Sequence, residues 1–340
     1  MAPRPSRRPW RHVLMSLSFV EQVAMLARES FNKKSELLMA ASALIISSLA
    51  SWVIRYRMFD FYENAKIGFF IVVCCCLWMG LFDSILCICD ARDVLERDKF
   101  SGLNPYSFVL ANVAWQAVHA LLQTAILYAM STYIIEWPTD VAAILAPTMV
   151  EYFLTLFLIT FAAQMLGLGV SAIVHTSQQA LTVAPFILIY ELIMSETLFG
   201  LPDAIRPLRE TTIVRWGLSA LGTIFDIDTL PWKAETSVKK IMGQVSQQVT
   251  SQVTDSVARE MSKSPVGGVK IPFFDTLIAR LQDYITNFPL DPGVLGVNHN
   301  LPEYTATAPF LAHVWLMLGV LALVGVLLAL VGLRRTVETR

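Results

Sequence analysis

The chain has 340 residues, of which 55% are hydrophobic and 16% are charged, and its mean hydropathy is +0.56. Soluble globular proteins are roughly 45–50% apolar and about 25% charged, so this composition excludes a disordered chain and argues against a soluble enzyme. The formal net charge is −1. Because nucleic-acid-binding proteins usually carry a basic excess, we expect no nucleic-acid partner.

Six segments reach the length of roughly 20 mostly apolar residues that a transmembrane helix needs. Five of them fall within residues 36–197, and the third to fifth carry more polar residues than a helix surrounded by lipid tolerates. Those three are therefore expected inside a bundle or beside a path. We predict an all-α membrane protein with six transmembrane helices, at residues 36–55, 65–87, 107–131, 149–173, 180–197 and 308–332.

Lys and Arg residues are distributed unevenly between the predicted spans. Thirteen lie in residues 1–35, the loop after the second span and the C-terminal tail, whereas the short loops on the other side hold Arg55, Arg57 and Lys66. Because short cytoplasmic loops carry the basic excess, we expect both termini in the cytoplasm. A large extracytoplasmic loop, 198–307, then joins spans five and six. The absence of N-x-[ST] sequences favours a multi-pass protein of the bacterial inner (cytoplasmic) membrane.

The segments outside the spans differ in character. Residues 1–18 predict a disordered basic arm, and residues 333–340 form a cytoplasmic tail. In residues 19–35 an apolar stripe at helical spacing predicts an amphipathic helix in the membrane interface, although a helical extension of span one fits the same pattern. Residues 234–262 predict a second amphipathic helix, which needs a second copy of the chain or residues 271–288 to pack on.

The loop after the second span is dense in charges of both signs. Helix propensity is good over residues 90–101, and Gly102 and Pro105 end the helix. A short charged helix suits docking onto a soluble cytoplasmic partner, and a solvated connector is the other interpretation. The charged residues assigned to this candidate docking surface are Asp90, Arg92, Asp93, Glu96, Arg97 and Asp98.

Polar groups inside the predicted spans form a second candidate site, because ionisable side chains are costly in lipid. A rise of about 1.5 Å per residue places His119 and Glu191 at a similar depth, roughly 18–20 Å from the side where their spans begin. Gln116 and Gln123 lie one helical turn from His119. We expect these residues to form a polar patch on a translocation path or between subunits. The alternative is a buried hydrogen-bonded pair that fixes helix packing.

Motifs for chemistry are absent from these 340 residues. There is no G-x-x-x-x-G-K-[ST] sequence and therefore no expected P-loop, and G-x-S-x-G, H-E-x-x-H and CxxC do not occur either. The five cysteines fall within residues 74–89, which excludes a disulfide framework, and the Cys74–Cys76 run is interpreted as small packing residues. The histidines lack the spacing of metal ligands. We predict no catalytic residue, metal site or cofactor on this chain.

Several stretches resemble one known family. An amphipathic helix with Arg28 near its end precedes span one, and Arg97-Asp98, Gly102 and Tyr106 match the charged pair, glycine and tyrosine that open the family's third span. QMLGLGVSAIVHTSQQALTVAPFILIYELIMS resembles its fourth and fifth spans, and VRWGLSALGTIFDIDTL resembles its R-W-x-x-x-A-L motif. On these residues the chain resembles the permease subunit of a type-2, white-type (G-subfamily-like) ABC exporter.

This resemblance implies a function. Residues 90–101 correspond to the family's coupling helix, which inserts into a separate ABC ATP-binding subunit that carries ATP and Mg. A second permease copy, most simply a homodimer, completes an exporter that moves an amphipathic lipid, peptide, drug or glycoconjugate by alternating access. Family members often have Gln where Glu191 stands, and we place no family counterpart on residues 233–305.

Two other classes of function remain open on the sequence. A membrane-anchored interaction protein would need a self-sufficient outer domain, but residues 234–305 have few aromatics and no cysteine pair. An intramembrane enzyme built on His119 and Glu191 would need a nucleophile or metal partner that the sequence does not offer. We therefore expect a permease surrounded by membrane lipid.

Overall fold

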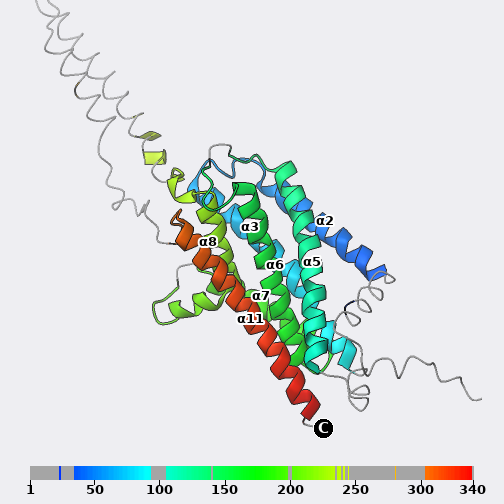
Figure 1. Cartoon of the computed structure of the whole chain (residues 1–340). Coiled ribbons are helices and arrows are strands. Elements are labelled where there is room, and N and C mark those ends of the chain that lie inside the picture. The colour runs from blue at the N-terminus through cyan, green and yellow to red at the C-terminus, as the bar shows by residue number, and fades with distance from the viewer. Residues whose placement is uncertain are drawn as a thin grey trace, which may run out of the picture. The chain divides into compact units, whose positions relative to one another are not determined.

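The computed structural model describes residues 34–92, 105–138, 141–197, 201–233 and 303–338, together with positions 23, 236–238, 240, 241, 244 and 280. Within these residues the regular elements are helices, and there is no strand. The elements are α2 (Lys34–Ile54), α3 (Tyr62–Ser84), α5 (Pro105–Ile134), α6 (Thr148–Ile173), α7 (Ser177–Met194), η3 (Arg206–Thr211), α8 (Ile213–Ile224), η4 (Ile227–Thr229) and α11 (Ala308–Glu338) (Figure 1).

Five helical stretches are long and apolar enough to cross a membrane, and they confirm the second to sixth predicted spans. The first predicted span, 36–55, is helix α2, whose described apolar part, Leu38–Ile54, is shorter than the other five. Six spans and the sidedness of the termini therefore stay predictions. The five stretches are Tyr62–Arg92, Tyr106–Ile134, Thr148–Ile173, Ser177–Met194 and Ala308–Arg334.

Helix α6 is the centre of the bundle and packs closely on α3 and α11 through glycines. A Cβ added at Gly80 of α3 would lie 2.6 Å from the Thr160 carbonyl oxygen of α6. A Cβ at Gly325 of α11 would lie 2.5 Å from the Met165 carbonyl group of α6. Lipid provides no hydrophobic force between helices, so small residues that allow backbones to approach are a main source of association in membranes.

Helix α8 is a short helix that is buried on nearly every side. All of its residues except Arg215 are buried, and it packs on α6 and α11. Its Gly217 lies against Ile159 of α6 and Val73 of α3, so α8 fills the space between these spans.

A cluster of five aromatic rings packs together at the end of the bundle where α6 begins. Its five members come from five different helices or connecting segments, and neighbouring ring centroids are 4.7–5.9 Å apart, a normal range for edge-to-face and offset contacts. The cluster joins the α2–α3 turn, the end of α8 and the loop after α5 into one core. Its rings are those of Phe59, Phe69, Trp137, Tyr152 and Phe225.

The chain forms two compact units. The bundle is made of residues up to 59, residues 64–227 and residues from 302 onward, whereas residues 60–63 and 228–301 belong to a smaller unit. In the described part of the smaller unit, the Tyr62 ring stacks on Trp232 with centroids 4.3 Å apart, and the Tyr62 N–H donates to the Pro231 carbonyl. The sites below lie in the bundle.

Candidate functional site

The end of the second span is fastened to the turn between α6 and α7, and we call this contact the Arg92 junction (Asp90, Arg92, Ala172, His175 and Ser177). Residues 87–92 resume the helix after α3. The buried Arg92 guanidinium donates to the Ala172 carbonyl oxygen at 3.0 Å and to His175 Nδ1 at 2.9 Å. Ser177 Oγ donates to Asp90 Oδ1 at 2.5 Å.

Local sequence sets both sides of the Arg92 junction. Thr176 caps α7 by accepting from the Gln179 N–H, and the Gln179 side chain accepts from the N–H of His175, the residue before the cap. This arrangement holds His175 beside the last turn of α6. There the Arg92 cation donates to the Ala172 carbonyl, one of the last four of α6, which have no partner inside the helix. It also meets the negative end of the α6 dipole. The junction therefore contains a buried cation whose two terminal nitrogens bond to the end of α6 and to the turn before α7.

Two of the seven residues predicted for ATPase coupling, Asp90 and Arg92, are therefore placed at a helix junction. The other five lie outside the described residues, as does most of the predicted connecting helix 19–35. They are Asp93, Glu96, Arg97, Asp98 and Gly102. Their roles stay predictions.

The middle of the bundle holds a buried polar cluster centred on Asp83 of α3, which we call the Asp83 cluster. Asp83 Oδ2 lies 3.0 Å from His119 Nδ1 of α5 and accepts from Gln123 Nε2 of α5 and Gln164 Nε2 of α6, both at 3.1 Å. The Asp83 side chain is 3% exposed. Gln116 of the same α5 face donates to Cys87 Sγ at 3.0 Å.

Glu191 lies elsewhere, so the four predicted polar residues do not form one patch. Glu191 Oε2 accepts from the Ile213 and Val214 N–H groups, at 2.8 and 3.2 Å, at the first turn of α8. These amides have no partner inside their own helix, and a carboxylate there also meets the positive end of the helix dipole. The expected meeting of His119 with Glu191 is thus replaced by two arrangements, a His119–Asp83 pair and a carboxylate that caps α8.

Sequence reasoning missed Asp83 and His175. Asp83 was inside the predicted second span, and the rule that singled out His119, an ionisable group at membrane depth, applies to it equally. No signal marked His175, because a histidine in a short turn has no periodic pattern. Its role follows only from the position of Arg92.

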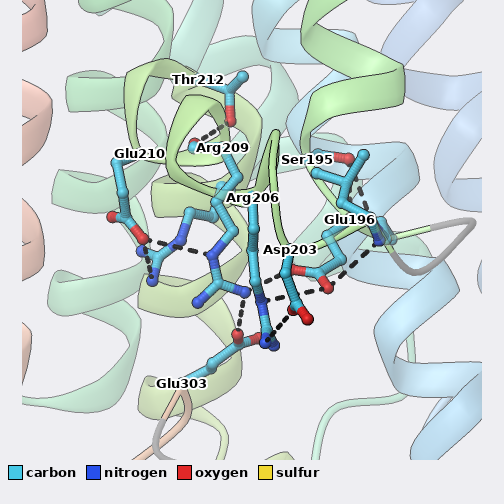
Figure 2. Close-up of polar contacts among 11 residues, drawn as sticks. Ser195, Glu196, Asp203, Arg206, Arg209, Glu210, Thr212 and Glu303 are labelled. Atoms are coloured by element: carbon cyan, nitrogen blue, oxygen red, sulfur yellow. Dashed lines mark hydrogen bonds and ion pairs between the residues drawn. The ribbon is translucent and has the colours of Figure 1, made fainter.

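A third cluster joins the end of α7, η3 and the segment before α11, and Figure 2 shows it around Arg209. Arg209 Nη1 donates to Glu196 and, at 2.6 Å, to Glu303 Oε1, while Arg209 Nε donates to Glu210 at 3.3 Å. Arg215 Nη2 also lies 3.2 Å from Glu210 Oε1. This Arg209 cluster links residues that are 94 positions apart in the chain.

The Arg209 cluster shifts the protonation of its members. Partial burial alone would raise the pKa of the Glu196 carboxyl group, but hydrogen bonding and charge from Arg209 outweigh burial, so this pKa lies below its usual value. Partial burial would lower the pKa of Arg209, yet its bonds to Glu196 and the charge of Glu303 raise it. Both groups are therefore held in their charged forms.

Comparison with known proteins decides the family. Residues 17–224, more than half of the chain, match the ABC-2 type transporter family. The chain belongs to the ABC-2 type transporter family. It is therefore a multi-pass membrane component of an ABC transporter, and this family's membrane domain is a transport component rather than a catalytic one.

A curated relative agrees with this assignment. Over 154 residues the chain is 25% identical to the ABC transporter ATP-binding/permease protein Rv1747 of Mycobacterium tuberculosis (strain ATCC 25618 / H37Rv). The match covers 44% of this chain and 18% of that protein. The chain therefore spans only a small part of the length of this relative, which combines ATP-binding and permease functions in its name. The ABC-2 match includes the Arg92 junction, the Asp83 cluster and α8.

Proposed function

We propose that this ABC-2 protein is the permease of an ATP-driven exporter, coupled to an ABC ATPase through the helix at residues 90–101. The observation that carries the coupling proposal is the Arg92 junction. Asp90 and Arg92 open the proposed coupling segment, and their partners lie at the end of α6 and the start of α7. A push on this segment would therefore be passed to α7 rather than absorbed by a flexible loop.

Helix α7 is suited to carry such a movement across the membrane. It begins at the Arg92 junction and ends near Glu191, which bonds to the first turn of α8. Pro185 lies inside it and lacks an N–H, so one hydrogen bond is missing there and the helix bends more easily. We propose that α7 and α8 move together between inward- and outward-open states, with Glu191 as their connection.

The same helix offers a surface for a second permease copy. Phe186, Ile189 and Ile193 of α7 are more than half exposed in the single chain. We propose a homodimer in which α7 faces the partner copy and helps to line the path. Exposed apolar side chains there suit an amphipathic substrate, which would be a lipid, peptide, drug or glycoconjugate.

ATP hydrolysis is proposed to reside on an ABC ATP-binding domain that these 340 residues do not contain, with Mg bound there. The printed name of the Mycobacterium tuberculosis relative combines ATP-binding and permease functions in one protein. For this chain we propose instead that the ATP-binding domain lies on a separate subunit. The proposed location is the bacterial cytoplasmic membrane, with both termini and residues 90–101 on the cytoplasmic side.

The direct test is to purify the tagged chain from its native membrane in mild detergent and to measure both the co-purified proteins and the ATPase activity. We expect a P-loop protein on a separate band of a denaturing gel. Simultaneous replacement of Glu96, Arg97 and Asp98 by Ala should reduce the recovered ATPase by about tenfold, since a few central residues dominate binding at most interfaces.

A matched control is Asp203→Ala, which removes a charge from a fully exposed side chain in the Arg209 cluster. This variant should recover the ATPase as the wild type does. Full recovery of an active ATPase by the triple variant would contradict the coupling proposal. Recovery of no P-loop protein by the wild-type chain would contradict the proposed function as a whole.

A further inference from the structure

The end of α2 presents a cation between two exposed aromatic rings. Arg55 Cζ lies 4.7 Å from the centroid of the Trp52 ring and 4.1 Å from that of the Tyr56 ring. Trp52 is 61% exposed and Tyr56 is 62% exposed. Cation–π contacts position a guanidinium without neutralising it. Among the residues that the structure describes, no carboxylate forms an ion pair with Arg55.

The backbone after Arg55 is held in place. The Asn64 side chain donates to the Arg57 carbonyl at 2.9 Å, and the buried Met58 side chain packs on Gly68. Phe59 belongs to the aromatic cluster of the bundle core. The Arg55 site is therefore displayed on an anchored turn, and little conformational freedom remains to be lost when a ligand binds.

Helix α2 has two faces of different character. Its buried face consists of small residues, Ala43, Ser47 and Ser51, and the helix packs mainly on α5. Its exposed face carries a stripe of large apolar side chains that ends at the Arg55 site. The stripe is formed by Ile45, Leu49, Trp52 and Val53.

The length of this stripe matches one leaflet of a membrane. From Ile45 to Ile54, where α2 ends, the helix rises roughly 14 Å at about 1.5 Å per residue. Half of a typical hydrocarbon core is roughly 15 Å. A molecule with an anionic head at the Arg55 site and an apolar tail along the stripe would therefore be in register with the surrounding bilayer.

We propose that Arg55, Trp52 and Tyr56 form a binding site for a phospholipid, with its phosphate at the Arg55 guanidinium and an acyl chain along the Ile45–Leu49–Trp52 stripe. Guanidinium–phosphate hydrogen bonds are charge-assisted and directional. Trp and Tyr rings favour the headgroup level of a membrane. The site is independent of the exporter proposal, because it lies on α2 and uses no residue of the Arg92 junction.

A second copy of the chain fits this face less well. Two copies in one membrane are related by an axis along the membrane normal, so a symmetric contact through this face would bring Arg55 near Arg55 of the other copy at the same depth. Facing like charges oppose such an interface. A lipid phosphate instead supplies the charge that Arg55 lacks.

The test is native mass spectrometry of the purified, delipidated full chain with added phosphatidylglycerol, or with diacylglycerol of the same acyl chains. Wild type should retain phosphatidylglycerol and little diacylglycerol, since only the former has a phosphate. Arg55→Gln should weaken phosphatidylglycerol binding by about tenfold, the size expected for one charge-assisted contact. Arg55→Lys should keep part of the affinity, and Trp52→Leu should weaken binding with the charge intact.

The matched control is Arg57→Gln, which removes an equal charge two residues away and should bind phosphatidylglycerol as the wild type does. Equal binding by Arg55→Gln and wild type overturns the proposal, as does equal loss in Arg57→Gln. Inorganic phosphate that binds as tightly as the lipid would also overturn it, because the apolar stripe would then contribute nothing. A change of oligomeric mass in Arg55→Gln or Trp52→Leu would identify the face as a contact between copies instead.

Discussion

Three buried carboxylates inside or beside the spans are each satisfied by several hydrogen-bond donors. Asp83, Glu151 and Glu191 each accept at least two N–H groups, from side chains in the first case and from backbone in the others. A buried charge without partners costs several kcal/mol, whereas one that satisfies orphan amides contributes to stability. These groups are therefore explained as structural before any role in transport is invoked.

Close glycine contacts between helices are a second feature of single residues. Helix α11 has one glycine in such a contact, Gly325, and one outside any contact, Gly319, so replacing each by Ala distinguishes the effect of packing from that of helix propensity. Gly325→Ala should destabilise the bundle by about 1–3 kcal/mol, since its Cβ would lie 2.5 Å from the Met165 carbonyl group and force α6 and α11 apart. The measurement is thermal unfolding in detergent.

Gly319→Ala is the matched control on the same helix, because nothing lies within 4 Å of the added Cβ. Removing a helical glycine is itself favourable by about 0.5–1 kcal/mol, so this variant should be as stable as the wild type or slightly more stable. Equal melting temperatures for Gly325→Ala and Gly319→Ala would mean that the close α6–α11 contact is not needed for stability.

At the scale of elements, the sequence predicted the long helices and missed how they are connected. A run of some 20 apolar residues has few alternatives to a spanning helix, and the predicted segment 107–131 became α5 at Pro105–Ile134 with little change. Helix α8 has only 12 residues, too few for a span, so its sequence could not distinguish a buried helix from an interfacial segment. The partner of Glu191 could not be predicted for the same reason, since it is the start of that helix.

The Arg209 cluster connects three elements and makes a prediction about pH. The pKa of Glu196 is lowered on folding, so its contribution to stability is complete above its unfolded pKa, about 4.3, and is lost as the pH falls through the lower folded pKa. Wild type should therefore lose melting temperature more steeply between pH 5 and pH 3 than Glu196→Gln does. Thermal unfolding across this pH range measures the difference.

Two arginine variants serve as the comparison at pH 7. Arg209 is 15% exposed and bonds Glu196 and Glu303, so Arg209→Gln should cost about 1–3 kcal/mol. Arg206 is 51% exposed and 3.7 Å from Glu196, so Arg206→Gln should cost less than about 1 kcal/mol. Equal effects of the two, or equal acid sensitivity of wild type and Glu196→Gln, would show that the cluster does not stabilise the link between α7 and α11.

For the whole molecule, helix α2 decides the topology. Five stretches that meet the length and apolarity of a span place the two termini on opposite sides of a membrane, whereas a sixth places them on the same side. The exposed apolar stripe of α2 favours contact with lipid over its length, and its small-residue face favours packing on a spanning α5. The excess of Lys and Arg near both termini favours the same side as well.

We therefore expect epitope tags inserted in residues 1–18 and after residue 338 to be protected from antibody in intact cells and reached after permeabilisation. A tag inserted in residues 264–300 should be reached in intact cells, because it follows the fifth predicted span. This third position is the internal control for cell integrity and expression. Protection of one terminal tag together with exposure of the other would mean that α2 does not cross the membrane. The Arg55 site would then lose its register with one leaflet, since that register requires α2 to run through the hydrocarbon core.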